Sequence, residues 1–300
     1  AVILIDARKG VLTQTRRHSF LAHLLGIRHI VLAVNKMDLV GYDKAVFDRI
    51  TLAYRAFASE IGITHFTAIP ISGFKGDNIT ALSANTPWFK GPALIEHLET
   101  VEVGGAADEA KPFRMPVQWV NRPNLDFRGF SGQLASGTVK PGDAVRILPS
   151  GKTTTVGRIV TLGGDLDEAV AGQSVTLTLA DEVDCSRGDV IAAADNPPEA
   201  ADQFEATLVW MADEAMIPGR AYWLKLATQS VSATVHAPKY EINVNTLDHL
   251  AAKTLDLNGI GVVEMSTDKP ITFESYSDNR SLGGFILIDK LTNATVAAGM

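Results

Sequence analysis

The sequence predicts a multi-domain protein in which an α/β domain with a parallel sheet precedes two all-β regions. Over residues 1–105, short apolar runs alternate with amphipathic segments of helical period, the pattern of parallel strands connected by helices. Beyond residue 105 the helical period disappears, and short alternating runs are separated by turns rich in Gly, Pro and Asp, which indicates β-barrels. We therefore expect an α/β domain over 1–105 and β-barrel domains over 112–196 and 200–300.

The apolar runs of the first domain define its expected strands. They occupy residues 1–5, 30–34 and 66–71, and their nearly continuous apolar character predicts parallel strands buried on both faces. Between the first two strands, a helix is expected from about Thr13 to a stop at Gly26. The buried side of this helix is expected to carry Phe20, Leu21, Leu24 and Leu25.

Two further helices are expected in the same domain. Asp43 can accept a hydrogen bond from the first turn of a helix whose apolar residues recur at helical spacing. These residues are Val46, Phe47, Ile50, Tyr54, Phe57, Ala58 and Ile61. The last helix follows Gly91 and Pro92, since proline suits a first helical turn. Its inward-facing residues are expected to be Leu94, Ile95 and Leu98.

The remaining chain is predicted to consist of strands joined by turns. Residues 104–112 are small, polar and aperiodic and are interpreted as a linker, and a second soft boundary falls at 195–199. Val175, Leu177 and Leu179 alternate with threonines, which is typical of a half-buried strand. In the last region, strands are expected at 206–210, 221–226, 261–265 and 285–287.

Composition narrows the functional classes. The 300 residues are 46% hydrophobic and 20% charged, with a net charge of -7. The chain therefore lacks the excess of basic residues that would predict a nucleic-acid partner, although a local basic patch can exist within an acidic total. The longest apolar runs are too short to cross a bilayer, so no membrane contact is expected. The single cysteine, Cys185, excludes an internal disulfide and fits a reducing, cytoplasmic location. The histidines show no paired ligand spacing, so no metal site is expected from these residues.

A polar tetrapeptide follows the second expected strand. Asn35, Lys36, Met37 and Asp38 come where that strand ends, and ligands of open α/β sheets bind outside the carboxyl ends of the strands. The Asp38 carboxylate can accept hydrogen bonds from the ring N1–H and the exocyclic amino group of guanine, Asn35 can meet the acceptor edge of the base, and the Lys36 stem can lie over the ring. Adenine lacks the N1–H donor. The alternative interpretation is a polar turn that caps the next helix.

A second motif follows the third expected strand. Ser72 and Gly73 follow residues 66–71. The hydroxyl of Ser72 and a backbone N–H of this turn can complete a base pocket by donating to the guanine oxygen. Such turns are common, so this motif alone is a weak signal. Because both motifs end successive parallel strands with a helix between them, we expect them to lie side by side. Together they predict a guanine site formed by Asn35, Lys36, Asp38, Ser72, Gly73 and Phe74.

These two motifs resemble the fourth and fifth guanine-recognition motifs of translation-factor-type GTPases. The order of an α/β domain and two β-barrels is also similar to that of the elongation factor Tu group, which makes residues 1–105 the C-terminal half of a GTP-binding G domain. More narrowly, the stretches 86–98, 116–132 and 277–289 resemble the GTPase subunit family of bacterial sulfate adenylyltransferase. The likeness covers nearly the whole chain, with one mild departure: the fifth motif usually has Ala where Gly73 stands.

The resemblance implies an activity. Members of this family hydrolyse GTP to drive a partner subunit that makes adenosine 5'-phosphosulfate and pyrophosphate from ATP and sulfate. The ligands implied are therefore GTP and GDP, and the implied partner is a catalytic adenylyltransferase subunit. Adenylyl transfer belongs to that partner, and no catalytic residue is expected in this chain. In some members a kinase domain that phosphorylates the product is fused downstream.

The phosphate- and magnesium-binding motifs of such GTPases are not found in these 300 residues. A P-loop, a switch threonine and an Asp-x-x-Gly motif are expected before the strand at 1–5, and a chain that opens inside a strand without an initiator Met is interpreted as truncated. Residues 151–153 mimic the end of a P-loop in a strand–turn–strand context, and the Asp-x-x-Gly matches at 126–129 and 256–259 lie among β-strands. We predict that these residues alone do not hydrolyse GTP and that Mg²⁺ binds only together with the upstream segment.

Two other functions fit the same pattern. A translation elongation factor that carries aminoacyl-tRNA would share the architecture, and the acidic net charge does not separate it from the first hypothesis. A non-enzymatic binding module built on the β-barrels, with the α/β part as a vestige, is the third possibility. Co-purification of RNA in a salt-sensitive manner would favour the elongation factor.

Overall fold

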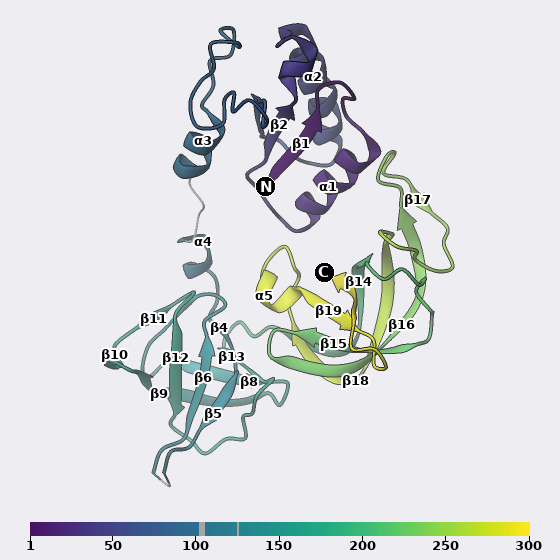
Figure 1. The fold of residues 1–300 in the computed structure, drawn as a ribbon. Helices are drawn as coiled ribbons and strands as arrows, with labels where there is room; N and C mark the ends of the chain where they lie inside the picture. The colour runs from purple at the N-terminus through teal and green to yellow at the C-terminus, as the bar shows by residue number, and fades with distance from the viewer. Residues whose placement is uncertain (102–105, 125) are drawn as a thin grey trace. The chain divides into compact units, whose positions relative to one another are not determined.

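The computed structural model describes residues 1–101, 106–124 and 126–300. The chain divides into two compact units (Figure 1). An α/β unit is formed by Ala1–Val103 with Asn243–Asp248, and an all-β unit by Gly104–Ile242 with His249–Met300. The expected domain boundary at residue 105 lies outside the described residues. Among the helices that the structure describes, none is long and apolar enough to span a membrane.

A parallel sheet forms the centre of the α/β unit. Its strands are β1 (Val2–Asp6), β2 (Val31–Asn35) and β3 (Thr67–Pro70), paired in the order β1-β2-β3. The predicted strands and their parallel arrangement are confirmed. In register, Asp6 pairs with Asn35 and Val34 with Pro70, so the carboxyl ends of all three strands meet at one edge of the sheet.

Two of the predicted helices connect these strands, and the third follows β3. They are α1 (Thr13–Leu24), α2 (Lys44–Glu60) and α3 (Leu94–Thr100), with the 3-10 turn η1 (Met37–Val40) between β2 and α2. Helix α1 ends at Leu24, and Gly26, the predicted stop, follows the C-cap residue with a φ of +62° that glycine readily adopts. The Asp43 carboxylate caps α2 by accepting the Ala45 N–H at 2.8 Å, as predicted. The buried residues of α2 are Phe47, Ile50, Tyr54, Phe57 and Ala58.

Burial contradicts the sequence interpretation in three places. Val2 and Leu4 on β1 are 39% and 61% exposed, because only the opposite face of the strand, which carries Ile3 and Ile5, is packed. Leu25 is 40% exposed, since α1 ends before it. Ile95 and Leu98 are 39% and 44% exposed rather than facing inward, because only the first turn of α3, at Leu94, packs against the core around β2 and β3.

The first half of the all-β unit is one curled sheet. Its strands are β4 (Arg114–Pro116), β5 (Trp119–Asn121), β6 (Gly129–Gln133), β8 (Ala144–Leu148), β9 (Lys152–Thr161), β10 (Gly164–Leu166), β12 (Ser174–Leu179) and β13 (Val190–Ala193), and β7 (Thr138–Val139) pairs separately with β11 (Ala169–Val170). The hydrogen-bonded path begins at β4 and ends at β5, which are separated in the chain by Val117 and Gln118, so the sheet curls until its ends meet. Helix α4 (Ala106–Glu109) precedes this sheet in the chain, so part of the predicted linker is helical. Residues 104 and 105 of the linker lie outside the described residues.

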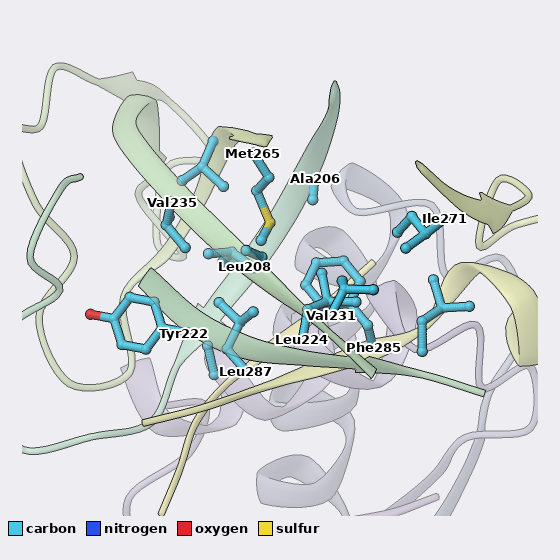
Figure 2. Close-up of a cluster of buried hydrophobic side chains, with 14 of the residues drawn as sticks. Ala206, Leu208, Tyr222, Leu224, Val231, Val235, Met265, Ile271, Phe285 and Leu287 are labelled. Carbon is cyan, nitrogen blue, oxygen red and sulfur yellow. The ribbon is translucent and has the colours of Figure 1, made fainter. Parts of the chain in front are cut away.

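The second half of the all-β unit is a closed barrel. Its elements are β14 (Glu199–Trp210), β15 (Ala221–Leu226), β16 (Gln229–Ile242), β17 (His249–Leu250), β18 (Ile260–Phe273), α5 (Arg280–Gly283), β19 (Phe285–Ile288) and β20 (Thr295–Gly299). The path β15-β19-β20-β14-β18-β16 closes because β15 also pairs with β16. Inward-facing side chains fill it, as Figure 2 shows for Leu208, Tyr222, Leu224, Met265 and Leu287. The predicted fold class, α/β followed by β-barrels, is confirmed.

Candidate functional site

The two predicted motifs lie at the carboxyl ends of neighbouring strands. Strand β2 ends at Asn35, and Lys36 turns the chain into η1 with a φ of +64°. Strand β3 ends at Pro70, and a short loop begins at Ser72. The Met37 N–H donates to the Ile71 carbonyl at 3.2 Å, which ties the start of the first loop to the residue that follows β3.

A direct hydrogen bond joins Asp38 to Ser72. The Ser72 hydroxyl donates to Oδ1 of Asp38 at 2.7 Å and accepts the Lys75 N–H at 3.1 Å. Ser72 has no exposed surface, so this contact is sheltered from water. A serine hydroxyl has one proton, and here it goes to Asp38 rather than to a ligand. The expected donation to a guanine oxygen would require this hydroxyl to turn away from Asp38, and it stays a prediction.

The second contact between the loops is made by Asn35. Its Oδ1 accepts the Lys36 N–H at 2.7 Å and the Gly73 N–H at 2.9 Å. Asn35 thus steadies the neighbouring loop. Since Oδ1 has two N–H donors, the amide group Nδ2 is the end left for an acceptor on a ligand.

Gly73 has room for a side chain. A Cβ placed on it would lie 3.6 Å from Oδ1 of Asn35, an ordinary van der Waals distance. Neither the space nor the backbone therefore requires glycine, and the departure from the usual Ala leaves the geometry of this loop intact.

Two groups of the site remain open to a ligand. Within the described chain, Oδ2 of Asp38 accepts no hydrogen bond and the Phe74 N–H donates none. The Phe74 side chain is 89% exposed. The site thus offers a carboxylate acceptor from one loop, and a backbone donor with an exposed ring from the other.

Lys36 is held by a residue that sequence reasoning missed. Its ammonium lies 3.0 Å from Oδ2 of Asp6, which ends β1 directly opposite Asn35. Arg8 donates to both oxygens of Asp6, at 3.0 and 2.6 Å. The hydrogen bonds from Arg8, followed by that from Lys36, outweigh burial and hold the pKa of Asp6 well below its usual range. The available signal was positional, because β1 ends at the same edge of the sheet.

The described residues offer no alternative metal or thiol chemistry. Among them, no three His, Cys, Asp or Glu side chains come together in a way that could hold a metal ion. Cys185 is 1% exposed, and burial raises the pKa of its thiol to about 12, so it is not poised to act as a nucleophile.

Comparison with protein families places each part of the chain. The "Elongation factor Tu GTP binding domain" matches residues 1–101, "Elongation factor Tu domain 2" matches 131–192, and "GTP-eEF1A C-terminal domain-like" matches 203–300. The chain belongs to the elongation-factor-Tu-like GTPase superfamily. Residues 1–101 are its GTP-binding module, so the strand tips described above lie in the domain that binds GTP or GDP in this superfamily.

Curated relatives narrow the family. "Bifunctional enzyme NodQ" of Rhizobium sp. (strain N33) is 57% identical over 300 residues, all of this chain and 46% of the relative. "Bifunctional enzyme CysN/CysC" of Xylella fastidiosa is 54% identical over 299 residues and is covered to 48%. "Sulfate adenylyltransferase subunit 1" of Saccharophagus degradans is 51% identical over 300 residues and is covered to 64%. The predicted resemblance is confirmed, and the chain spans between 46% and 64% of these relatives.

Solved structures agree on the fold. Crystal structures of sup35 complexed with GMPPNP and with GDP superpose with TM-scores of 0.60 and 0.59 at 24% identity. The superposition covers 99% of this chain and 76% of each sup35 chain. At this identity the likeness shows the architecture of the superfamily and nothing about ligands.

Proposed function

We propose that this chain is part of the GTP-binding regulatory subunit of a sulfate adenylyltransferase. In this proposal, GTP hydrolysis by the full-length subunit drives a partner catalytic subunit that forms adenosine 5'-phosphosulfate from ATP and sulfate in sulfate assimilation. The domain boundaries proposed are 1–105, 112–196 and 200–300. Similarity over the whole of this chain to 64% of a protein named as subunit 1 of sulfate adenylyltransferase supports both the activity and the existence of a partner.

The contact between Asp38 and Ser72 carries the nucleotide assignment. The serine holds one oxygen of the carboxylate, at 2.7 Å, and leaves the other without a partner in the described chain. A carboxylate has about four lone-pair sites, so Asp38 can still accept the N1–H and the amino group of guanine. The Phe74 N–H and the Asn35 amide are the donors for the acceptor atoms of the base. We therefore assign guanine binding to Asn35, Lys36, Asp38, Ser72, Gly73 and Phe74.

Adenine is expected to be rejected at this site. It carries no N1–H, and its amino group stands where guanine has an oxygen. Bound adenine would leave the Asp38 carboxylate desolvated without a donor and would face the Phe74 N–H with another donor. An unsatisfied charged group of this kind costs about 1–3 kcal/mol or more.

Calorimetry on the full-length protein tests the pocket. We expect GDP to bind and ADP not to bind measurably at the same concentration. IDP lacks the amino group and loses one charge-assisted hydrogen bond, so its affinity is expected to be about ten- to a hundredfold lower than that of GDP. Equal affinities for GDP and ADP would overturn the assignment of Asp38.

The partner is tested by co-purification at several salt concentrations. A catalytic adenylyltransferase subunit retained with the full-length protein supports the proposal. RNA retained in a salt-sensitive manner would instead support a translation factor. Protein that retains neither and binds no GDP would be the β-barrel binding module.

Phosphate chemistry is assigned to residues outside this chain. None of the 300 residues forms a P-loop in a strand–loop–helix context, so Mg²⁺ and the phosphates are proposed to bind with the upstream half of the G domain. The chain by itself is proposed not to hydrolyse GTP. We place the full-length protein in the cytoplasm, where its buried thiol stays reduced.

A further inference from the structure

A third hydrogen-bonded tie joins the two loops outside the proposed base site. The Tyr42 hydroxyl donates to Oδ2 of Asp77 at 2.6 Å. Asp77 belongs to the second loop, because its carbonyl accepts the Ser72 N–H at 3.2 Å and closes that loop into a hairpin. Tyr42 belongs to the first loop and follows η1, which contains Asp38. The bond therefore links the far ends of the two loops that contribute Asp38 and Phe74.

The Asp77 end of this tie is held by further hydrogen bonds. Its other oxygen, Oδ1, accepts the Ser83 hydroxyl at 2.6 Å and the Asn85 amide at 3.1 Å. Burial raises the pKa of the carboxyl, but the hydrogen bonds from Ser83, Tyr42 and Asn85 outweigh it, so its pKa lies below the usual value. Asp77 is therefore an anion at neutral pH that is held by three donors.

The Tyr42 end is held in an uncommon conformation. Tyr42 has a φ of +56°, a region that costs a non-glycine residue about 1–2 kcal/mol. Its carbonyl accepts the Trp88 indole N–H at 3.1 Å, and the Trp88 ring packs on Phe47 with centroids 5.3 Å apart. The bond to Asp77 raises the pKa of Tyr42 to about 12, so the hydroxyl keeps its proton at neutral pH. A strained residue kept in place by its surroundings is typical of a functional constraint.

We propose that Tyr42 and Asp77 are positioning residues that set the separation of the two loops and thereby the residence time of the guanine nucleotide. The inference rests on the proposed function. Neither side chain is among the groups left open to the base, so their effect passes through Asp38 and Phe74. The inference also gives a role to the sequence around Trp88, which the base site itself does not use: it fixes the turn from which Tyr42 reaches Asp77.

The test is the dissociation rate of a fluorescent GDP analogue from the full-length protein. Tyr42→Phe removes one charge-assisted hydrogen bond and leaves the ring in place. We expect dissociation about three- to thirtyfold faster than in the unchanged protein. The matched control is Tyr54→Phe, which removes the bond from a fully buried tyrosine hydroxyl to Ser19 (2.9 Å) in the same unit but away from both loops. The control is expected to lower the melting temperature and to leave the dissociation rate unchanged.

A second variant separates positioning from simple stability. Asp77→Asn is combined with Tyr42→Phe in a double-mutant cycle read on the dissociation rate. We expect the double variant to release GDP no more than about twofold faster than the faster single variant, because both changes break the same contact between Tyr42 and Asp77.

The possible results either support or overturn the inference. Dissociation from Tyr42→Phe at the unchanged rate, an equal acceleration in Tyr54→Phe, or fully additive effects in the cycle would overturn it while leaving GDP binding intact. If the unchanged full-length protein bound no GDP, the proposed function would fail, and this inference with it.

Discussion

Replacing Gly73 by alanine tests whether the second loop has the geometry described here. A Cβ on Gly73 would meet the nearest atom, Oδ1 of Asn35, at 3.6 Å, so it fits without displacing a neighbour. The backbone of Gly73 lies outside the left-handed region, so alanine can adopt it without strain. Alanine has fewer conformations than glycine in the unfolded chain. The substitution is therefore expected to stabilise the loop.

The magnitude follows from chain entropy alone. A glycine-to-alanine change at a compatible position stabilises by about 0.4–1 kcal/mol. For amides that exchange through local opening of the loop, the added stability slows exchange by about two- to fivefold. The amides that report it are those of Gly73, bonded to Asn35, and of Lys75 and Gly76, bonded to Ser72. The affinity of the full-length protein for GDP is expected to stay the same or to rise.

Hydrogen exchange followed by mass spectrometry on the 72–77 loop measures this effect, and the same loop provides the control. Gly76 has a φ of +82° with open space around its Cβ position, so alanine there meets strain but no clash. Gly76→Ala is expected to cost about 1–2 kcal/mol and to speed exchange by about five- to thirtyfold. Faster exchange or lost GDP binding in Gly73→Ala, or no effect in Gly76→Ala, would refute the described loop geometry.

Three further outcomes are expected. Truncating Phe74 to alanine removes an exposed ring at the base site and should weaken GDP by about 1–3 kcal/mol, with no change in melting temperature; unchanged calorimetric affinity would remove Phe74 from the site. Cys185 should resist iodoacetamide at pH 8 until the protein unfolds, and rapid labelling of folded protein by mass spectrometry would contradict its burial. The pKa of Asp77 is lower folded than unfolded, so its stabilisation is present above about pH 4 and lost as the pH falls through the folded value. Unfolding of Asp77→Asn should therefore depend less on pH in that range than unfolding of the unchanged protein.

Sequence patterns predicted the elements whose signals are local. The Asp43 cap, the Gly26 stop and the apolar runs each fix one element without reference to the rest of the chain, and the structure confirms them. The pairing of the two motifs was also predictable, because the carboxyl ends of adjacent parallel strands meet at one edge. Whether they form a guanine site stays a prediction that binding measurements decide.

Features that depend on packing were not predictable in the same way. Helical spacing could not show that Ile95 and Leu98 face solvent, since the spacing only indicates which residues share a side and not whether anything covers it. The Ser72 hydroxyl could donate to either a base or a carboxylate, and only the placement of Asp38 decides between them. The tie between Tyr42 and Asp77 crosses 35 positions in the chain and has no local signal.

The residue Asp38 provides the most direct test of guanine recognition. In Asp38→Asn, the amide oxygen can keep the bond from Ser72, and the amide N–H₂ faces the ligand as a donor. We expect GDP affinity of the full-length protein to fall by about a hundredfold or more and XDP, which carries a carbonyl at that ring position, to become the preferred ligand. Asp48→Asn, on the exposed face of α2, is the control and should leave both affinities unchanged. Unchanged GDP affinity in Asp38→Asn would contradict the guanine site and the function proposed from it.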